Sequence, residues 1–186
     1  MRNEEYILPA SPRRFTRAEY HQLIEFGLFA RERLELVHGI LLQMSPIGIA
    51  HRRVVSRLNK LLLPRLLGRA EVFIQQPYAA ADDSEPEPDL AVVAPGEYAS
   101  GHPSRAFLLI EVADTSLEYD RATKAPLYAA SFVDEYWIVN LAERVVEVYR
   151  EPANGKYGKL AYHRAGDVLS PAPFPDVAVS VAELIP

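Results

Sequence analysis

The chain has 186 residues, of which 49% are hydrophobic and 24% are charged, as expected for a soluble globular protein of one domain. It contains no cysteine, which excludes disulfides, thiolate metal sites and cysteine nucleophiles. Lys and Arg number 20 against 25 acids, and the net charge of −5 argues against a large basic surface, so any contact with nucleic acid must come from a local basic patch.

The apolar segments and the N-terminus bear on where the protein is found. No apolar stretch approaches the roughly 20 residues that a membrane helix needs. The first residues, "MRNEEYILPASPRRF", lack the apolar core of a signal peptide. We therefore expect a cytoplasmic protein with no membrane contact, folded as a single domain over residues 1–186 with its core at about 15–185.

The first third of the chain predicts a helix, a hairpin and a second helix. In "TRAEYHQLIEFGL", Thr16 and Glu19 form a capping box that begins a short helix. "RLELVHGILLQM" predicts a tight hairpin that turns at His38 and Gly39, where glycine supplies the positive φ. "HRRVVSRLNKLLLPRLLG" has the apolar spacing of a helix, which Pro64 should kink or end.

The remaining patterns predict strands around one more helix. "EVFIQQPYAA", "DLAVVA" and "RAFLLIEVA" are typical of strands, as are "EYWIVNL", "VVEVYR" and "KLAYHRA", the last preceded by a turn at "ANGK". "DRATKAPLYAASF" predicts a helix in which Pro126 is tolerable only if the regular helix begins near Thr123. The order predicts an α/β (α+β) fold whose mixed central sheet is built largely from hairpins and flanked by helices.

Two acids stand at unexpected positions in the apolar strands. Asp89 lies at the start of the apolar run in "DSEPEPDLAVV", and Glu111 interrupts the run "AFLLIEVAD". If the two strands form an antiparallel hairpin with its loop centred near Ser100, Asp89 faces Glu111. Opposed residues share a face with Cα atoms about 4.5–5.5 Å apart, so one end of that face would carry two carboxylates.

Two buried neighbouring carboxylates need a cation. A lone ionised carboxylate in "FLLIEVA" carries a large desolvation cost, and two carboxylates side by side repel one another. A hard divalent cation relieves both costs, and oxygen ligands favour Mg²⁺ or Mn²⁺ over Zn²⁺ because there is no Cys and the histidines show no chelating spacing. The alternative is structural: Asp89 is solvated, and Glu111 pairs with an arginine such as Arg105 or Arg121.

Four sequence blocks, in order, resemble a known family. They are "EPEPDLAVV", "LLIEVADTS", "YDRATKAPLYA" and "DEYWIVNL", and they follow "RLELVHGILLQMSP" and His51. Together they are similar to the putative restriction endonuclease family, a bacterial branch of the PD-(D/E)xK nucleases, over about residues 15–185. The resemblance implies a restriction endonuclease-like mixed sheet flanked by helices, with its acids at one edge. It also implies hydrolysis of phosphodiester bonds with a divalent metal.

The resemblance assigns roles to individual residues. Asp89 corresponds to the motif aspartate and Glu111 to the acid that follows it, so both would bind metal, with the backbone carbonyl of Val112 as another ligand. The superfamily lysine should stand two residues after that acid, where this chain has Ala113. The candidate for that lysine is Lys124 on the next helix, which would orient or deprotonate the attacking water and offset charge on the phosphate.

Other candidates have structural alternatives. Lys124 could simply pair with Asp120 at i, i+4. Glu35 is a match for an upstream acid that binds a second metal or water, or else is an ordinary exposed strand acid. Candidate phosphate contacts lie at the start of the second helix, whose basic face could equally be solvated: they are His51, Arg52, Arg53 and Arg57.

The sequence contains none of the motifs G-x-x-x-x-G-K-[ST], G-x-G-x-x-G, G-x-S-x-G or H-E-x-x-H. From the facing acid pair and the family resemblance, we expect a Mg²⁺- or Mn²⁺-dependent endonuclease acting on DNA. Cutting both strands requires two sites, which predicts a homodimer or higher homo-oligomer. Ala113 and the acidic charge leave open a catalytically inactive nucleic-acid-binding or regulatory module with the same fold. A purely structural component of an oligomer is a third possibility.

Overall fold

A computed structural model describes residues 11–99 and 101–185. Residues 1–10, Ser100 and Pro186 lie outside the described residues. Two expectations fall on them: the lack of a signal peptide concerns residues 1–10, and the expected centre of the hairpin loop is Ser100. Within the described part of the chain, no helix combines the length and the hydropathy needed to cross a bilayer.

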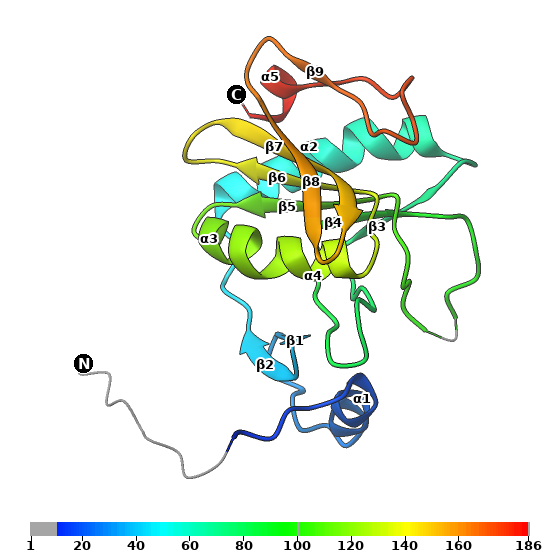
Figure 1. The fold of residues 1–186 in the computed structure, drawn as a ribbon, viewed down its shortest axis with the longest axis vertical. Coiled ribbons are helices and arrows are strands. Elements are labelled where there is room, and N and C mark those ends of the chain that lie inside the picture. The colour runs from blue at the N-terminus through cyan, green and yellow to red at the C-terminus, as the bar shows by residue number, and fades with distance from the viewer. Residues whose placement is uncertain (1–10, 100, 186) are drawn as a thin grey trace, which may run out of the picture.

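A six-stranded mixed sheet forms the centre of the fold, as the sequence predicts (Figure 1). Its spatial order follows the chain: β3 (Glu71–Ile74), β4 (Leu90–Val93), β5 (Leu108–Ala113), β6 (Glu135–Asn140), β7 (Val145–Ala153) and β8 (Lys156–His163). Neighbouring strands are antiparallel except for β5 and β6, which are parallel and need a crossover connection. Ala91 pairs with Leu109, which confirms the expected register of β4 and β5.

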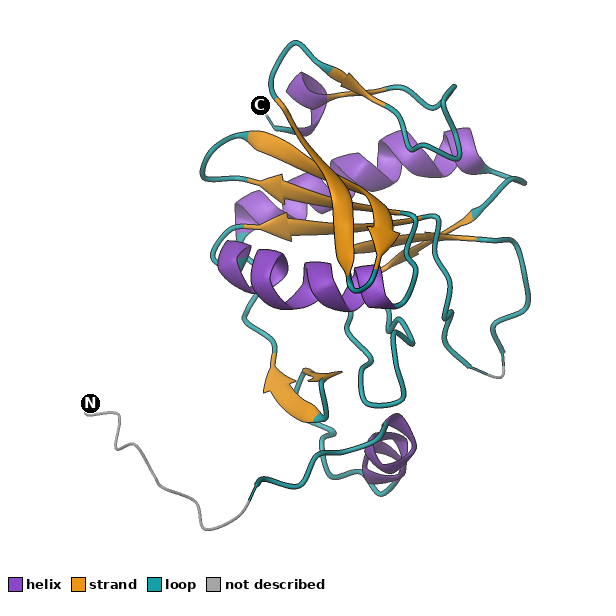
Figure 2. Cartoon of the chain, in the orientation of Figure 1, coloured by secondary structure: helices purple, strands orange, loops and turns teal. Residues whose placement is uncertain are grey.

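Helices cover both faces of the sheet (Figure 2). On one face, α2 (Ile49–Leu66) packs with the even-numbered residues of β5, such as Ile110. The other face is covered by the crossover between β5 and β6, which packs with odd-numbered residues of β5 such as Leu109. The crossover comprises α3 (Leu117–Tyr119), the π-helix η1 (Asp120–Lys124) and α4 (Ala125–Ala130). Because side chains alternate along a strand, Glu111 lies on the crossover face.

The N-terminal elements lie below the sheet in Figure 1. They are α1 (Arg17–Glu25), which begins with the predicted capping box, and the hairpin of β1 (Leu34–Val37) and β2 (Ile40–Gln43). The hairpin turns at His38 and Gly39, which have φ of 50° and 73°. An isolated bridge between Leu36 and Glu85 joins β1 to the segment that leads into β4.

The sequence analysis did not anticipate the C-terminal elements. They are β9 (Val168–Leu169), β10 (Val179–Ser180) and α5 (Val181–Leu184). Buried residues of this segment, including Leu169, Val179 and Leu184, belong to the same core as α2. The C-terminal segment therefore closes the α2 side of the core.

Three predicted boundaries need correction. The α2 helix runs past Pro64 and ends at Leu66. The strand expected over 71–80 stops at Ile74 because Gln75 takes a left-handed conformation with φ of 49°, which breaks the extended run. The crossover becomes helical at residue 117, earlier than the expected 120, and its residues 120–124 form a π turn in which the N–H of residue 125 bonds to the carbonyl of residue 120. The regular helix begins at residue 125, close to the expected Thr123, so Pro126 falls in its first turn as predicted.

Candidate active site

A pocket of about 510 Å³ opens where the β1–β2 hairpin, the first turn of α2 and the crossover meet the start of β4 and the end of β5. Most of the predicted site residues line it: Glu35, His51, Asp89, Glu111, Val112 and Lys124. Its acids outnumber its lysine and arginine side chains. The basic residues are Arg33 and Lys124, and the acids are Glu35, Glu87, Asp89, Glu111, Asp114 and Asp120. The pocket therefore favours a cation.

Asp89 is held in a fixed orientation immediately before β4. Its Oδ2 accepts a 2.8 Å hydrogen bond from the backbone N–H of Val112 and lies 2.8 Å from His51 Nε2. Its Oδ1 accepts a 3.2 Å hydrogen bond from Gln75 Nε2. Asp89 is 7% exposed, so contacts from three separate elements compensate for the lost hydration of its carboxylate.

Lys124 joins Glu111 and Glu35 in a buried ion-pair cluster. Its Nζ donates to Glu111 Oε1 at 2.8 Å and lies 3.3 Å from Glu35 Oε2. Tyr128 OH also donates to Glu111 Oε1, at 2.9 Å, and Tyr119 OH donates to Glu35 Oε1, at 3.0 Å. Glu35 is therefore buried, and the alternative that it is an ordinary exposed strand acid is wrong.

One ammonium group does not balance the surrounding carboxylates. Burial raises the pKa of Glu111 well above its ordinary value; the Lys124 ammonium opposes this rise, while Asp120 and Asp89 add to it. Burial disfavours the charged form of Lys124, but the carboxylates of Glu111, Glu35 and Asp120 outweigh burial and raise the Lys124 pKa. The cluster therefore holds a charged lysine beside acids whose burial and crowding disfavour the ionised form of Glu111.

Two further acids complete the electrostatics of the pocket. Burial raises the pKa of Asp120 to about 6 despite the nearby Lys124, and its Oδ2 accepts a hydrogen bond from Ser116 Oγ at 2.7 Å. Burial also raises the pKa of Glu87, against the opposing effect of Arg33, whose guanidinium donates to Glu87 at 3.3 Å. Both acids add to the demand for a cation.

The alternative pairings do not form. Lys124 pairs with Glu111 and Glu35, whereas the carboxylate of Asp120 accepts from a serine. Arg121, one proposed partner of Glu111, donates from Nε to Glu147 Oε2 at 3.0 Å. Glu111 is therefore tied to the candidate catalytic lysine and not to a structural arginine.

The basic face of α2 is not gathered at the pocket. His51 lines the pocket, but Arg52 and Arg53 are exposed and do not line it. Arg57 donates to the carbonyl of Leu184 at 3.2 Å, which ties α2 to the C-terminal helix. Of the proposed phosphate contacts, only His51 lies beside the acids.

Sequence reasoning missed several residues that support the site. Tyr128 is buried, as expected for a core residue, but its hydroxyl also contacts Glu111. Its spacing of four from Lys124 on a helix is a signal that could have been used. Glu87 precedes Asp89 by two, so the two acids share a side of an extended segment. Gln75 and Tyr119 gave no such signal.

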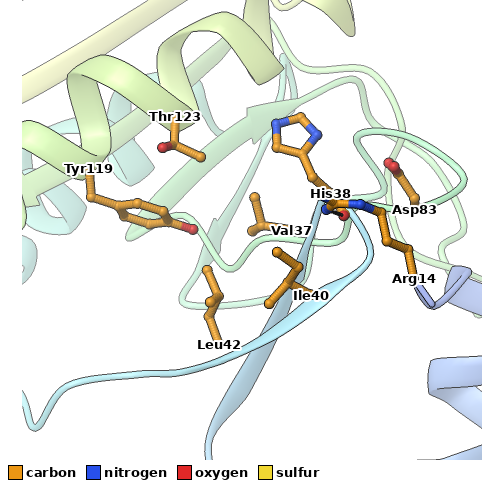
Figure 3. A pocket seen from close by; sticks show the side chains of 8 residues that line it. All are labelled: Arg14, Val37, His38, Ile40, Leu42, Asp83, Tyr119 and Thr123. Carbon is orange, nitrogen blue, oxygen red and sulfur yellow. Dashed lines mark hydrogen bonds between the residues drawn. The ribbon is translucent and has the colours of Figure 1, made fainter. Parts of the chain in front are cut away.

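A neighbouring pocket of about 460 Å³ lies between the β1–β2 hairpin and the crossover (Figure 3). Tyr119 and Thr123 of the crossover lie opposite Val37 and Leu42 of the hairpin. Although Tyr119 and Leu42 also line the acidic pocket, this second pocket includes none of the buried acids that surround Lys124. It offers no comparable chemistry.

The acidic pocket fits a hard divalent cation. Carboxylate oxygens are the ligands that Mg²⁺ and Mn²⁺ prefer, and Asp89 and Glu111 supply them from adjacent strands. Among the described residues, the buried Nδ1 of His51 has no hydrogen-bond partner, so a polar atom beside Asp89 is left for a bound water or ligand. The donor groups of the pocket are therefore chemically suited to such an ion.

Comparison with known proteins gives the family of the chain. Residues 17–182 match the Uma2 family, which is described as "Putative restriction endonuclease". No curated protein is significantly similar to the chain. Solved structures that match include a crystal structure of a "putative nuclease belonging to DUF820" from Anabaena variabilis, which is 18% identical, with a TM-score of 0.66 over 91% of this chain and 97% of that chain.

The structural likeness confirms the predicted fold, and the family match confirms the resemblance noted in the sequence blocks. Since the matched segment covers most of the chain, the protein belongs to the Uma2 family, within the PD-(D/E)xK nuclease superfamily.

Proposed function

We propose that the protein is a metal-dependent endonuclease that hydrolyses phosphodiester bonds in DNA. Membership of the Uma2 family supports nuclease function in general terms. The observation that carries the proposal further is the contact of Lys124 with Glu111 and Glu35 in the pocket that also contains Asp89. Acids that could hold a metal ion, beside a lysine that could offset charge on a phosphate, are groups that metal-assisted phosphodiester hydrolysis can use.

Asp89 and Glu111 would hold Mg²⁺ or Mn²⁺, with the carbonyl of Val112 as a further oxygen ligand. When bound, the cation would supply Lewis-acid chemistry for the attack of water on phosphorus. Glu35 would bind a second cation or a water molecule. The Val112 amide and Gln75 fix the carboxylate of Asp89, so its oxygens need little reorganisation.

Lys124 would take the role of the superfamily lysine, whose usual position is occupied here by Ala113. Its ammonium reaches Glu111 from the crossover helix, so it lies beside the same acid from a different element. There it would orient the attacking water and offset charge on the phosphate. His51, next to Asp89, would contact the phosphate, with Arg53 and Arg57 as more distant basic groups on the same helix.

The test is cleavage of supercoiled plasmid by the pure protein with Mg²⁺ or Mn²⁺. We expect nicked and linear products, and a loss on the order of 10²–10³-fold or more in Glu111→Gln and Lys124→Met, because each removes a charge at the reacting centre. Lys159→Met, on the exposed face of β8, is the matched control and should cleave as wild type does. Intact plasmid with wild type under all metal conditions would overturn the proposal.

The rival function is a nucleic-acid-binding or regulatory module without turnover. The observation that favours it is that Lys124 already contacts both Glu111 and Glu35, so these acids are satisfied in part without a metal. Calorimetric titration with Mg²⁺ separates the two functions. Salt-sensitive DNA binding without Mg²⁺ binding at Asp89 and Glu111 would support the module.

A cytoplasmic homodimer is part of the proposal. One acidic pocket of this kind lets one protomer cut one strand, so cleavage of a duplex in both strands calls for two copies. Light scattering should therefore give twice the mass of the chain at micromolar concentration. A monomeric mass would remove the dimer from the proposal while leaving single-strand cleavage intact.

A further inference from the structure

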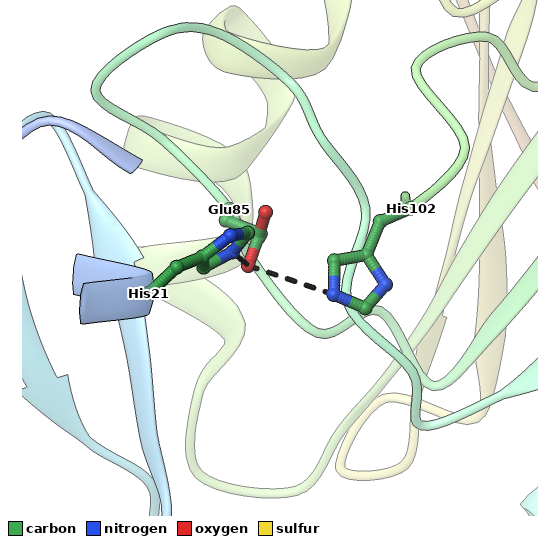
Figure 4. Close-up of side chains that lie close together, drawn as sticks. All are labelled: His21, Glu85 and His102. Carbon is green, nitrogen blue, oxygen red and sulfur yellow. Dashed lines mark hydrogen bonds and ion pairs between the residues drawn. The ribbon is translucent and has the colours of Figure 1, made fainter. Parts of the chain in front are cut away.

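A second group of potential metal ligands lies outside the acidic pocket (Figure 4). His21 comes from α1, Glu85 from the segment that leads into β4, and His102 from the loop between β4 and β5. His21 Nε2 is 2.7 Å from Glu85 Oε1, and His102 Nε2 is 3.9 Å from the same oxygen. One donor atom from each residue lies within 4.8 Å of the others.

The spacing of these donors suits a tetrahedral ion. Zinc takes nitrogen and oxygen ligands at about 2.0–2.2 Å, which places neighbouring ligands of a tetrahedron roughly 3.3–3.5 Å apart. The two observed separations, 2.7 and 3.9 Å, lie on either side of that value. Side-chain shifts of less than about an ångström would therefore bring the three donors into place, with water in the fourth position.

The carboxylate at the centre is only partly satisfied by protein groups, because one of its two oxygens has no hydrogen-bond partner among the described residues. That oxygen is the buried Oε2, and Glu85 as a whole is 2% exposed. Arg17 NH1 approaches that oxygen only to 3.6 Å. This leaves Oε1 for the two imidazoles, whose rings are packed edge to face with centroids 5.9 Å apart.

An ion can reach the cluster from solvent. The side chains of His21 and His102 are 42% and 40% exposed, so the imidazoles stand at the surface while the carboxylate lies beneath them. A deep anionic ligand under two accessible imidazoles is the arrangement that a metal ion needs in order to enter and lose most of its water. None of the three residues lines the acidic pocket.

The cluster connects three parts of the chain that are distant in sequence. The backbone of Glu85 forms the bridge to Leu36, next to Glu35, and the same segment continues to Glu87 and Asp89. An ion held by the two histidines and Glu85 would fasten α1 and the β4–β5 loop to this segment. It would thereby limit the movement of the backbone that carries two acids of the proposed active site.

We propose that His21, Glu85 and His102 form a zinc site of the His₂Glu type that clamps α1 and the β4–β5 loop onto the segment before β4. The ion ties these elements together, keeps a fourth position open to water, and is separate from the Mg²⁺ or Mn²⁺ of the acidic pocket. Because nitrogen ligands predominate, the site selects zinc over those hard cations. The proposal stands independently of nuclease activity.

Calorimetric titration with Zn²⁺ of protein treated with a chelator tests the site. Wild type should bind one zinc ion at this site, and His21→Ala combined with His102→Ala should weaken binding by more than the roughly 10–100-fold that loss of an outer-shell partner costs. Zn²⁺ should raise the Tm of wild type and leave that of the double variant unchanged. Co²⁺ should give visible absorption bands of a tetrahedral site in wild type alone.

Two controls separate this site from other zinc-binding groups. His163→Ala removes a histidine near Asp167, away from the cluster, and should bind zinc as wild type does. Asp89→Asn combined with Glu111→Gln removes the acidic pocket and should also retain the site. Equal zinc affinity in wild type and the double histidine variant would overturn the proposal, as would loss of zinc binding in the acid variant alone.

Discussion

The ammonium of Lys124 contacts two buried carboxylates that reach it from different parts of the fold. Glu111 comes from the central sheet and Glu35 from the N-terminal hairpin, and each is less than 10% exposed. Removing one partner of a buried ion pair leaves an uncompensated charge, which costs far more than the loss of a surface pair. Lys124 therefore stabilises the protein as well as equipping the pocket for chemistry.

Lys124→Met should lower the free energy of unfolding at pH 7.5 by about 3–5 kcal/mol, because Glu111 and Glu35 lose their counter-charge. Adding Glu111→Gln to this variant should recover part of the loss. Urea denaturation in EDTA measures both effects. Lys159→Met, which breaks a surface pair with Glu151, is the control and should change stability little. Equal effects of the two lysine variants would show that the buried cluster contributes no more to the free energy of unfolding than a surface ion pair does.

Asp120 should make stability depend on pH. Burial raises its pKa to about 6, so the folded protein holds this proton at a pH where the unfolded chain has released it. Stability should fall as pH rises from about 4 to about 6, through the window between the unfolded and folded pKa values. Asp120→Asn keeps a neutral side chain, and its stability relative to wild type should increase by on the order of 2 kcal/mol between pH 4 and pH 7.

Urea denaturation at several pH values in EDTA measures that difference. A constant difference between Asp120→Asn and wild type across the range would contradict the prediction.

The sequence could identify the acids but not all of the groups around them. Asp89 and Glu111 stand out because an acid in an apolar strand is costly, and period-two alternation places them on one face. Lys124 and Glu35 came from the family resemblance. Gln75 could not be found, because its contact with Asp89 depends on a left-handed backbone at a residue that favours no such conformation.

The element that carries Lys124 shows why helix boundaries are harder to predict than strand registers. The pairing of β4 with β5 follows from alternation, and the observed register agrees. The π turn of η1 inserts one extra residue per turn, and a 3.6-residue pattern contains no sign of it. The two-residue strands β9 and β10 are likewise too short to give a periodic signal.

The end of β3 offers a test of backbone strain near the site. Gln75 has φ of 49° and donates to Asp89. Gln75→Ala loses the hydrogen bond and keeps the strain, whereas Gln75→Gly loses the same hydrogen bond and relieves the strain. Gln75→Gly should therefore be more stable than Gln75→Ala by about 1 kcal/mol in urea denaturation. Equal stability of the two variants would show that the left-handed residue is not strained.

At the scale of the whole molecule, one sheet separates two apolar cores. Trp137 belongs to the core beneath α2, and its neighbours Tyr136 and Ile138 belong to the core beneath the crossover. The strands contribute to both cores at once, so loss of either core should disrupt the other. This supports the proposal that residues 1–186 form a single domain.

Urea unfolding should accordingly show a single transition. Fluorescence of Trp137 reports on one core, and far-ultraviolet circular dichroism reports on the secondary structure of the whole chain. Coincident midpoints are expected, because a small single domain unfolds as one unit. An earlier transition seen by circular dichroism alone would show that the N-terminal elements unfold separately from the sheet.

The hairpin of β1 and β2 supplies Glu35 to the pocket but pairs with no strand of the six-stranded sheet in the described part of the chain. Its main-chain contacts with the segment before β4 include the bridge between Leu36 and Glu85 and a 2.7 Å hydrogen bond from the Gly39 N–H to the carbonyl of Asp83. An outward shift of this wall would break no rung of the central ladder, but it would separate Glu35 from Lys124 and Tyr119. The hairpin therefore couples the shape of the opening to the buried ion pairs, whereas the carboxylate of Asp89 is held by the central sheet through the Val112 amide.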